Sequence, residues 1–342
     1  MRKRFWFIPS LLVLVAIIAC VSSPTPIAQQ TAPSPSSQIT TSAPLAETET
    51  QPAPPAQVMK PGTYPQKIQA GGVVRTYILH VPPGYDGTKA LPLVFILHGF
   101  GGNAASMVKL TGMNDKADQE NFFVAYLNGT EGTNTDKGVS GLAWNNGLTP
   151  ELNMTVDDVA FVRDLLKHLE GQLYVDSHRV YAAGFSNGAM MTHRLGAELP
   201  DLLAGVAVVE GTIGLAQSDG SFVTTPTPIG SIAVIIIHGK RDMNLPYDGG
   251  QATQGAGKLY AKSAADSVAF WTQADSCTGT PEQETSGNGN VIKQDFTNCT
   301  AETEVLFYTI VNGQHEWPTL QGHTKFSATN AIWDFFVKHT LP

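Results

Sequence analysis

Apolar and polar positions alternate along residues 58–342 in the pattern of strands and helices within one folded region. Short apolar runs predict strands at 73–81, 93–97, 122–127, 180–185, 205–209, 232–237 and 304–311, the first of them at an edge of the sheet. Helical spacing follows at 159–169, 190–199, 261–274 and 326–339. Strands and helices in this order predict an α/β fold with a doubly wound, mostly parallel sheet and helices on both faces.

The N-terminus has the form of an export signal. Basic residues at 2–4 precede an apolar stretch at 5–19, which is shorter than the roughly 20 residues of a membrane span. The stretch ends in Ile17-Ile18-Ala19-Cys20, which resembles the lipobox of bacterial lipoproteins, where lipid is attached to the cysteine. An ordinary secretion signal that contains a cysteine is the alternative. We expect residues 1–20 to be a lipoprotein signal peptide and the protein to be extracytoplasmic, bound to a membrane only through lipid on Cys20.

Residues 21–57 differ in composition from the rest of the chain. They consist mainly of Pro, Ser, Thr, Ala and Gln, and Glu47 and Glu49 are their only charges. Such a segment buries too little apolar surface to offset the entropy of ordering it. We expect a disordered linker here, followed by one domain at 58–342, a size that a single α/β core reaches.

The chain has three cysteines. With Cys20 taken by lipid, Cys277 and Cys299 remain as an even pair, which favours a disulfide in an exported protein. Closing a loop of this length stabilises a fold by roughly 3 kcal/mol in the chain-entropy model. A metal site is the alternative, but the paired spacing that zinc prefers is missing, and we expect no metal.

The formal net charge is −8 at pH 7, and loss of the basic residues at 2–4 makes it more negative. A negative chain is poorly suited to bind nucleic acid or the surface of an anionic membrane. A neutral polymer or an ester is the better match as a partner.

The most informative motif is Gly184-Phe185-Ser186-Asn187-Gly188, between a predicted strand and a predicted helix. This is the form of a nucleophile elbow, a sharp turn that exposes a serine hydroxyl at the end of a sheet. Chain packed closely around the serine leaves no room for a Cβ at the two glycine positions. The motif alone is common, and a simple glycine-rich turn is the alternative.

A serine hydroxyl needs a base to take its proton and an acid to orient that base. In proteins with this elbow, the acid and then a histidine follow the serine along the chain. Asp242 follows the predicted strand at 232–237, so its side chain is expected at the same edge of the sheet as Ser186. Asp248 and Asp266 are further candidates for the acid, but Asp242 is nearest the end of the strand.

His315 follows the last predicted strand and has the required final place in the order. His323 lies one loop further on, and His339 falls on the C-terminal helix. His98 and His238 each precede a glycine at the end of a strand, where a role in orienting the loop is expected. His315 is therefore the candidate base.

The segment Leu97-His98-Gly99-Phe100-Gly101-Gly102 resembles the loop that supplies an oxyanion donor in such proteins. The backbone amides of Phe100 and Asn187 are the candidate donors, and loss of one such donor raises a barrier by about 3 kcal/mol. A phosphate-binding loop is the competing interpretation, but no Gly-Lys-Ser/Thr follows.

Five motifs in order resemble the polyhydroxybutyrate depolymerase-like esterases, which include LpqC-type lipoproteins and the feruloyl and acetylxylan esterases of carbohydrate esterase family 1. The motifs are Leu97-His98-Gly99, Val156-Asp157-Asp158-Val159-Ala160-Phe161, Gly184-Phe185-Ser186-Asn187-Gly188-Ala189-Met190, His238-Gly239 with Asp242, and Gly313-Gln314-His315-Glu316-Trp317-Pro318. The resemblance extends from about residue 60 to the C-terminus. It implies an α/β-hydrolase fold with Ser186 as nucleophile, His315 as base, Asp242 as acid and a disulfide between Cys277 and Cys299. That group often has a second glycine before the histidine, where this chain has Gln314, so the detail of this loop is left open.

Two tryptophans lie in loops that are predicted to face the site. Trp144 and Trp317 are candidates for a flat apolar wall that binds substrate, and packed loop anchors are the alternative. Asn128, Asn153 and Asn298 match glycosylation acceptors, but with a bacterial lipobox we treat these matches as chance.

We therefore expect a serine esterase that works through an acyl-enzyme, without metal or organic cofactor. Feruloyl or acetyl esters of plant polysaccharides and hydroxyalkanoate polyesters are the expected substrates. A non-catalytic lipoprotein that binds a carbohydrate or polymer on the same scaffold is the alternative. A cofactor-dependent oxidoreductase is disfavoured because the dinucleotide-binding motif is missing.

Overall fold

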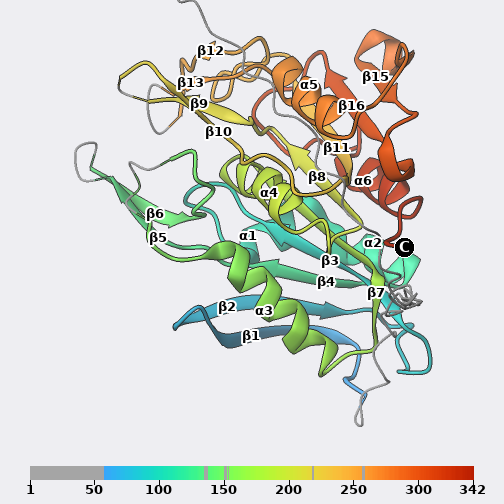
Figure 1. Cartoon of the computed structure of the whole chain (residues 1–342). Helices are drawn as coiled ribbons and strands as arrows, with labels where there is room; N and C mark the ends of the chain where they lie inside the picture. The colour runs from blue at the N-terminus through green and yellow to red at the C-terminus, as the bar shows by residue number, and fades with distance from the viewer. Residues whose placement is uncertain (1–57, 135–137, 150–151, 153, 218, 256–258) are drawn as a thin grey trace, which may run out of the picture. The chain divides into compact units, whose positions relative to one another are not determined.

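The computed structural model describes residues 58–342, apart from 135–137, 150–151, 153, 218 and 256–258 (Figure 1). The expected signal peptide with Cys20, the expected linker at 21–57 and Asn153 lie outside the described residues. None of the helices in the described part of the chain is long and apolar enough to cross a bilayer.

A ten-stranded sheet forms the framework of residues 58–342 (Figure 1). In spatial order its strands are β1 (Gly62–Ala70), β2 (Val73–Val81), β4 (Phe123–Leu127), β3 (Leu91–Leu97), β7 (Val175–Phe185), β8 (Gly205–Val209), β11 (Ala233–Gly239), β16 (Val305–Ile310), β15 (Val291–Phe296) and β14 (Glu282–Ser286). The strands from β4 to β16 in this order are parallel, and the outer strands pair antiparallel. The predicted mostly parallel sheet is confirmed.

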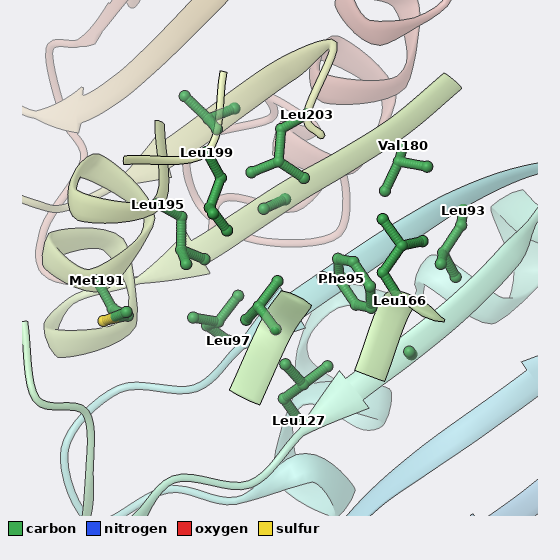
Figure 2. Close-up of a cluster of buried hydrophobic side chains, with 14 of the residues drawn as sticks. Leu93, Phe95, Leu97, Leu127, Leu166, Val180, Met191, Leu195, Leu199 and Leu203 are labelled. Atoms are coloured by element: carbon green, nitrogen blue, oxygen red, sulfur yellow. The ribbon is translucent and has the colours of Figure 1, made fainter. Parts of the chain in front are cut away.

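Helices cover both faces of the sheet. One face packs against α3 (Asp158–Glu170), α4 (Asn187–Glu198) and α5 (Ala264–Ala274), and the other against α1 (Ala104–Thr111), α2 (Met113–Glu120) and α6 (Ala328–Phe336). Successive side chains of a strand point to opposite faces, so a strand between two helical layers needs apolar residues throughout. Leu93, Phe95 and Leu97 of β3 accordingly lie in the first core, which Figure 2 shows, and Val94 and Ile96 lie in the second.

Two smaller β structures complete the described residues. A four-stranded sheet is formed by β10 (Phe222–Thr224), β9 (Gly214–Ala216), β13 (Tyr260–Ala261) and β12 (Gly250–Gln251). A hairpin is formed by β5 (Thr130–Asn134) and β6 (Val139–Ala143), and short 3₁₀ turns lie at Gly287–Gly289 and Thr300–Glu302. The strands of the four-stranded sheet and of the hairpin follow β4, β8 and β11, so they extend from the carboxyl ends of parallel strands.

The prediction of an edge strand at 73–81 is wrong, because β2 pairs with β1 on one side and β4 on the other. The sequence did not predict β1, because most of its residues are polar. In the structure these residues alternate between half-buried and exposed. At the opposite edge, β14 is exposed along its whole length and was likewise not predicted. The disulfide between Cys277 and Cys299 is present and encloses the β14–β15 hairpin.

Candidate active site

Ser186 lies at the sharp turn between β7 and α4. Its backbone has φ 55° and ψ −118°, a conformation that residues other than glycine rarely adopt. Its amide donates a hydrogen bond to the carbonyl of Val209, on the neighbouring strand β8, at 3.0 Å. The turn is therefore strained and is held by the sheet, as a nucleophile elbow requires.

The two glycines of the motif are required by close packing. A Cβ on Gly188 would lie 2.5 Å from the carbonyl oxygens of Leu97 and His98, at the end of β3. A Cβ on Gly184 would overlap the Gly188 carbonyl and the Thr192 hydroxyl. The start of α4 thus lies directly against the ends of β7 and β3, without space for a side chain at either position.

The imidazole of His315 bridges Ser186 and Asp242. Its Nε2 is 2.8 Å from Ser186 Oγ, and its Nδ1 is 2.7 Å from Asp242 Oδ2. A carboxylate only accepts hydrogen bonds, so Nδ1 carries the ring proton and Nε2 is free to accept the proton of the serine hydroxyl. The three side chains come from the loops after β7, β11 and β16, as the sequence predicted.

Asp242 is held by further hydrogen bonds. Its Oδ1 accepts from the amides of Asn244 at 2.7 Å and Leu245 at 2.9 Å, and its side chain is shut off from solvent. Burial alone would raise the pKa of this carboxyl, but the hydrogen bond and charge of His315 outweigh it and lower the pKa below its usual value. Asp242 is therefore ionised when it meets His315.

The other candidates for these positions have different partners. Asp266 accepts from the Ser263 amide and caps helix α5. His323 lies 3.0 Å from the Asn312 carbonyl, and His339 pairs with Glu304 at 3.5 Å. Within the described residues, Asp242 is the carboxylate that His315 contacts.

The loop after β3 lies against Ser186. A Cβ on Gly99 would be 3.2 Å from the Cβ of Ser186, and the Gly101 and Gly102 amides are bonded to the Leu142 and Gly99 carbonyls. In the described part of the chain, the amides of Phe100 and Asn187 donate to no protein acceptor. Both amides are therefore available to bind an oxyanion next to the serine.

His98 fixes this loop from inside the protein. Its Nδ1 lies 2.7 Å from the Gly99 carbonyl, and its Nε2 accepts from the Gly129 amide at 3.0 Å. Burial lowers the pKa of His98 to about 4, so the ring is neutral at physiological pH and carries its proton on Nδ1. The predicted role of His98 in orienting the loop agrees with these contacts.

The prediction that Trp144 and Trp317 form a substrate wall is wrong, because both rings are enclosed by protein. Trp144 is fully buried, and Trp317 is only 2% exposed. The Trp144 indole donates to the His98 carbonyl, and its backbone amide donates to Asn187 Oδ1, each at 2.8 Å. The Trp317 indole donates to the Thr329 hydroxyl. Both are packed loop anchors, and Trp144 joins the loop after β3 to the start of α4.

Sequence analysis missed Glu210, a fully buried residue directly after β8. Potential ligand atoms of Glu210, His238 and Asp242 lie within 4.8 Å of one another, which is the arrangement of a possible metal site. Both oxygens of Asp242 already accept hydrogen bonds, and His238 Nε2 is 2.9 Å from the Leu245 carbonyl. Asp242 and His238 of this cluster are therefore already bonded to protein groups, and Glu210 lies on the side of Asp242 away from solvent.

The serine lies at a strand-to-helix turn of a mostly parallel sheet, and it is bonded to a histidine that is in turn bonded to a buried aspartate. This arrangement defines the class of serine esterases with an α/β-hydrolase fold. The chain belongs to the esterase PHB depolymerase family, whose profile matches residues 75–248. The protein is therefore a carboxylic ester hydrolase.

Individual relatives agree with this family. NocK of Nocardia uniformis subsp. tsuyamanensis, which is named as a predicted esterase, is 31% identical and is matched over 90% of this chain and 88% of its own length. Feruloyl esterase B of Piromyces equi is 29% identical, and the match covers 78% of this chain and 46% of that longer protein. Among solved structures, an acetyl xylan esterase from Aspergillus awamori matches with a TM-score of 0.57 and 14% identity, over 80% of this chain and 99% of that one. At this identity the structural match supports the fold alone.

Proposed function

We propose that Ser186, His315 and Asp242 hydrolyse carboxylic esters through an acyl-enzyme. The observation that carries this proposal is the bridge by the His315 ring, 2.8 Å from the serine hydroxyl and 2.7 Å from the aspartate. Ser186 Oγ attacks the ester carbonyl while its proton passes to His315 Nε2, and Asp242 stabilises the imidazolium that forms. His315 then gives this proton to the leaving alcohol, and water releases the acid by the same route.

The amides of Phe100 and Asn187 are the proposed donors to the oxyanion. The free Asn187 amide at the first position of α4 supports this role, since the N-terminus of a helix favours negative charge. Gly99 places the loop with Phe100 against Ser186. Such donors act on the charge that develops in the transition state, where they are most effective.

The proposed substrates are feruloyl or acetyl esters of plant polysaccharides, with hydroxyalkanoate polyesters as the second candidate. The similarity to feruloyl esterase B of Piromyces equi supports the first, and the name of the family supports the second. The net charge of −8 favours neutral substrates of either kind. Side-by-side assays on methyl ferulate, acetylated xylan and a polyhydroxybutyrate film distinguish these substrates.

We also propose that the enzyme acts outside the cytoplasm, held by lipid on Cys20. The disulfide between Cys277 and Cys299 supports an oxidising compartment. Incorporation of labelled palmitate into the full chain tests the anchor: it is expected in the native protein and not in Cys20→Ala. Equal labelling of the two would contradict lipidation at this cysteine.

Ser186→Ala tests the reaction. We expect loss of turnover of p-nitrophenyl acetate and of covalent labelling by a fluorophosphonate, with an unchanged circular dichroism spectrum. Ser221→Ala, which alters an exposed serine in a turn, is the matched control and should keep both. A native protein that does not react with the probe would instead favour a non-catalytic lipoprotein that binds a polymer.

A further inference from the structure

Glu210 is a buried carboxyl that the proposed mechanism does not use. It directly follows β8, its side chain is closed to solvent, and its backbone has φ 52°. Its two oxygens lie 2.9 Å and 3.1 Å from the amide nitrogen of Gly239, the last residue of β11. Gly239 is three residues before Asp242, so Glu210 binds the same turn that presents the proposed acid.

A carboxyl oxygen of Glu210 also lies within 4.8 Å of one of Asp242, and the interaction between the two side chains raises the pKa of Glu210. Titratable groups around these two carboxyls are His238 on β11 and His315 and Glu316 after β16, and His193 on α4 interacts with His238. Of these, His238 comes within 3.4 Å of Glu210, but its Nε2 is closer to the Leu245 carbonyl, at 2.9 Å. Burial lowers the pKa of His238, which keeps that ring neutral.

None of these neighbours pairs a positive charge with Glu210, because the His238 ring is neutral and His315 bonds to Asp242. The charges that act on it are those of Asp242 and Glu316, and both are negative. Two ionised carboxylates this close together inside a protein repel each other and lose their hydration. Burial first, and then the charge of Asp242, raise the pKa of Glu210 well above its ordinary value.

We infer that Glu210 is a positioning residue for ester hydrolysis: its neutral carboxyl donates a hydrogen bond to Asp242 and accepts one from the Gly239 amide. The inference rests on the proposed function, because it assigns a task to the same aspartate. The hydrogen bond holds the Asp242 carboxylate in the orientation in which Oδ2 meets His315.

The neutrality of Glu210 has a second effect on the reaction. With Glu210 neutral, the negative charge bonded to the His315 ring is that of Asp242. A second negative charge next to Asp242 would favour the protonated ring, which cannot accept the serine proton. Glu210 thus contributes a hydrogen bond without adding a charge.

Glu210→Gln and Glu210→Leu test this inference. The glutamine keeps a donor for Asp242 and an acceptor for Gly239, so kcat and the acid side of the pH profile of kcat/KM should match those of the native enzyme. The leucine removes both bonds, and because a bond to a charged group is lost, kcat should fall by about 10- to 100-fold with KM unchanged.

Two outcomes would overturn the inference. The first is a shift of about one pH unit in the acid-side midpoint of the kcat/KM profile of Glu210→Gln, which would show that Glu210 is charged in the native enzyme. The second is a native kcat in Glu210→Leu.

An infrared measurement tests the neutral carboxyl without relying on activity or on the fold of Glu210→Leu. At pH 8 the native protein should show the C=O band of a protonated carboxylic acid, and Glu210→Gln should lack it. Burial also raises the pKa of Asp158, Asp275 and Asp295, so the band of Glu210 is identified as the part of the signal that Glu210→Gln removes. Absence of the band from the native protein would overturn the inference. If Ser186→Ala kept full activity, the proposed function would fail, whereas the band would still report the state of Glu210.

Discussion

The carboxylate of Asp158 accepts a hydrogen bond from the guanidinium of Arg75 at 2.6 Å, and both side chains are closed to solvent. The other oxygen of Asp158 accepts from the Asn145 amide at 2.7 Å. Arg75 lies on β2, Asp158 begins α3, and Asn145 follows Trp144, which holds the start of α4. The pair thus connects the outer part of the sheet to the segment that supports the site.

Asp158→Asn should lower the free energy of unfolding by about 3–5 kcal/mol, because it leaves the charge of Arg75 buried without a partner. Asp201→Asn is the control, since Asp201 pairs with Arg163 at the surface, and it should cost about 1 kcal/mol or less. Urea unfolding of both variants measures the difference. Equal losses of unfolding free energy in the two variants would mean that the buried pair stabilises the fold no more than the surface pair does.

Asp242→Asn should lower kcat of p-nitrophenyl acetate hydrolysis by about 10³- to 10⁴-fold, because the amide no longer stabilises the imidazolium and the correct ring tautomer. Asp248→Asn alters the other aspartate of the same loop and should keep activity within about twofold, since His315 bonds to Asp242. Initial rates of both variants, with circular dichroism as a check of folding, provide the comparison. If Asp248→Asn lost activity and Asp242→Asn kept it, Asp248 and not Asp242 would be the acid that orients His315.

Gly188→Ala should destabilise the protein by about 1–3 kcal/mol and abolish most of the activity, because its Cβ meets the carbonyls of Leu97 and His98 at 2.5 Å. Gly171→Ala is a suitable control. Gly171 has a helical backbone with φ −74°, and the nearest atom to an added Cβ is 3.4 Å away. Thermal unfolding and initial rates should separate the two, and a stable, active Gly188→Ala would contradict the packing argument.

His98 should remain neutral until the pH approaches about 4, because burial lowers its pKa from 6.5. Between these values the unfolded chain binds a proton at this position and the folded chain does not, so the free energy of unfolding falls as the pH is lowered. For this group alone, the loss from pH 7 to pH 5 should be about 2 kcal/mol. Nitrogen NMR of the imidazole measures the titration directly. The stability change between these pH values should be smaller in His98→Gln, and a ring that titrates near 6.5 would refute the prediction.

The order of the chemical residues was accessible from the sequence because of a geometric property of parallel sheets. The carboxyl ends of parallel strands lie at one edge, so residues placed directly after three apolar runs are brought together. Ser186, Asp242 and His315 each have this position, and the structure brings them within hydrogen-bonding distance. Their separation by up to 129 residues in the chain did not hide the relationship.

Other features had no comparable signal. The exposed residues of β14 are polar and read as a loop, because the pairing of an edge strand depends on its neighbour rather than on its own hydrophobicity. Trp144 stands in a polar segment that resembles a binding loop, yet its ring is buried. Glu210 follows an apolar strand just as Asp242 does, so the sequence offers two carboxylates at one edge of the sheet.

The sequence by itself determined the mostly parallel sheet, the strained turn at Ser186, and the order of serine, aspartate and histidine, because these depend on local periodicity and on glycine. Only the tertiary structure decided which carboxylate meets His315, which tryptophans are buried, and that Glu210 lies behind Asp242. Those outcomes depend on the side chains that surround each group in space, and such neighbours come from distant parts of the chain.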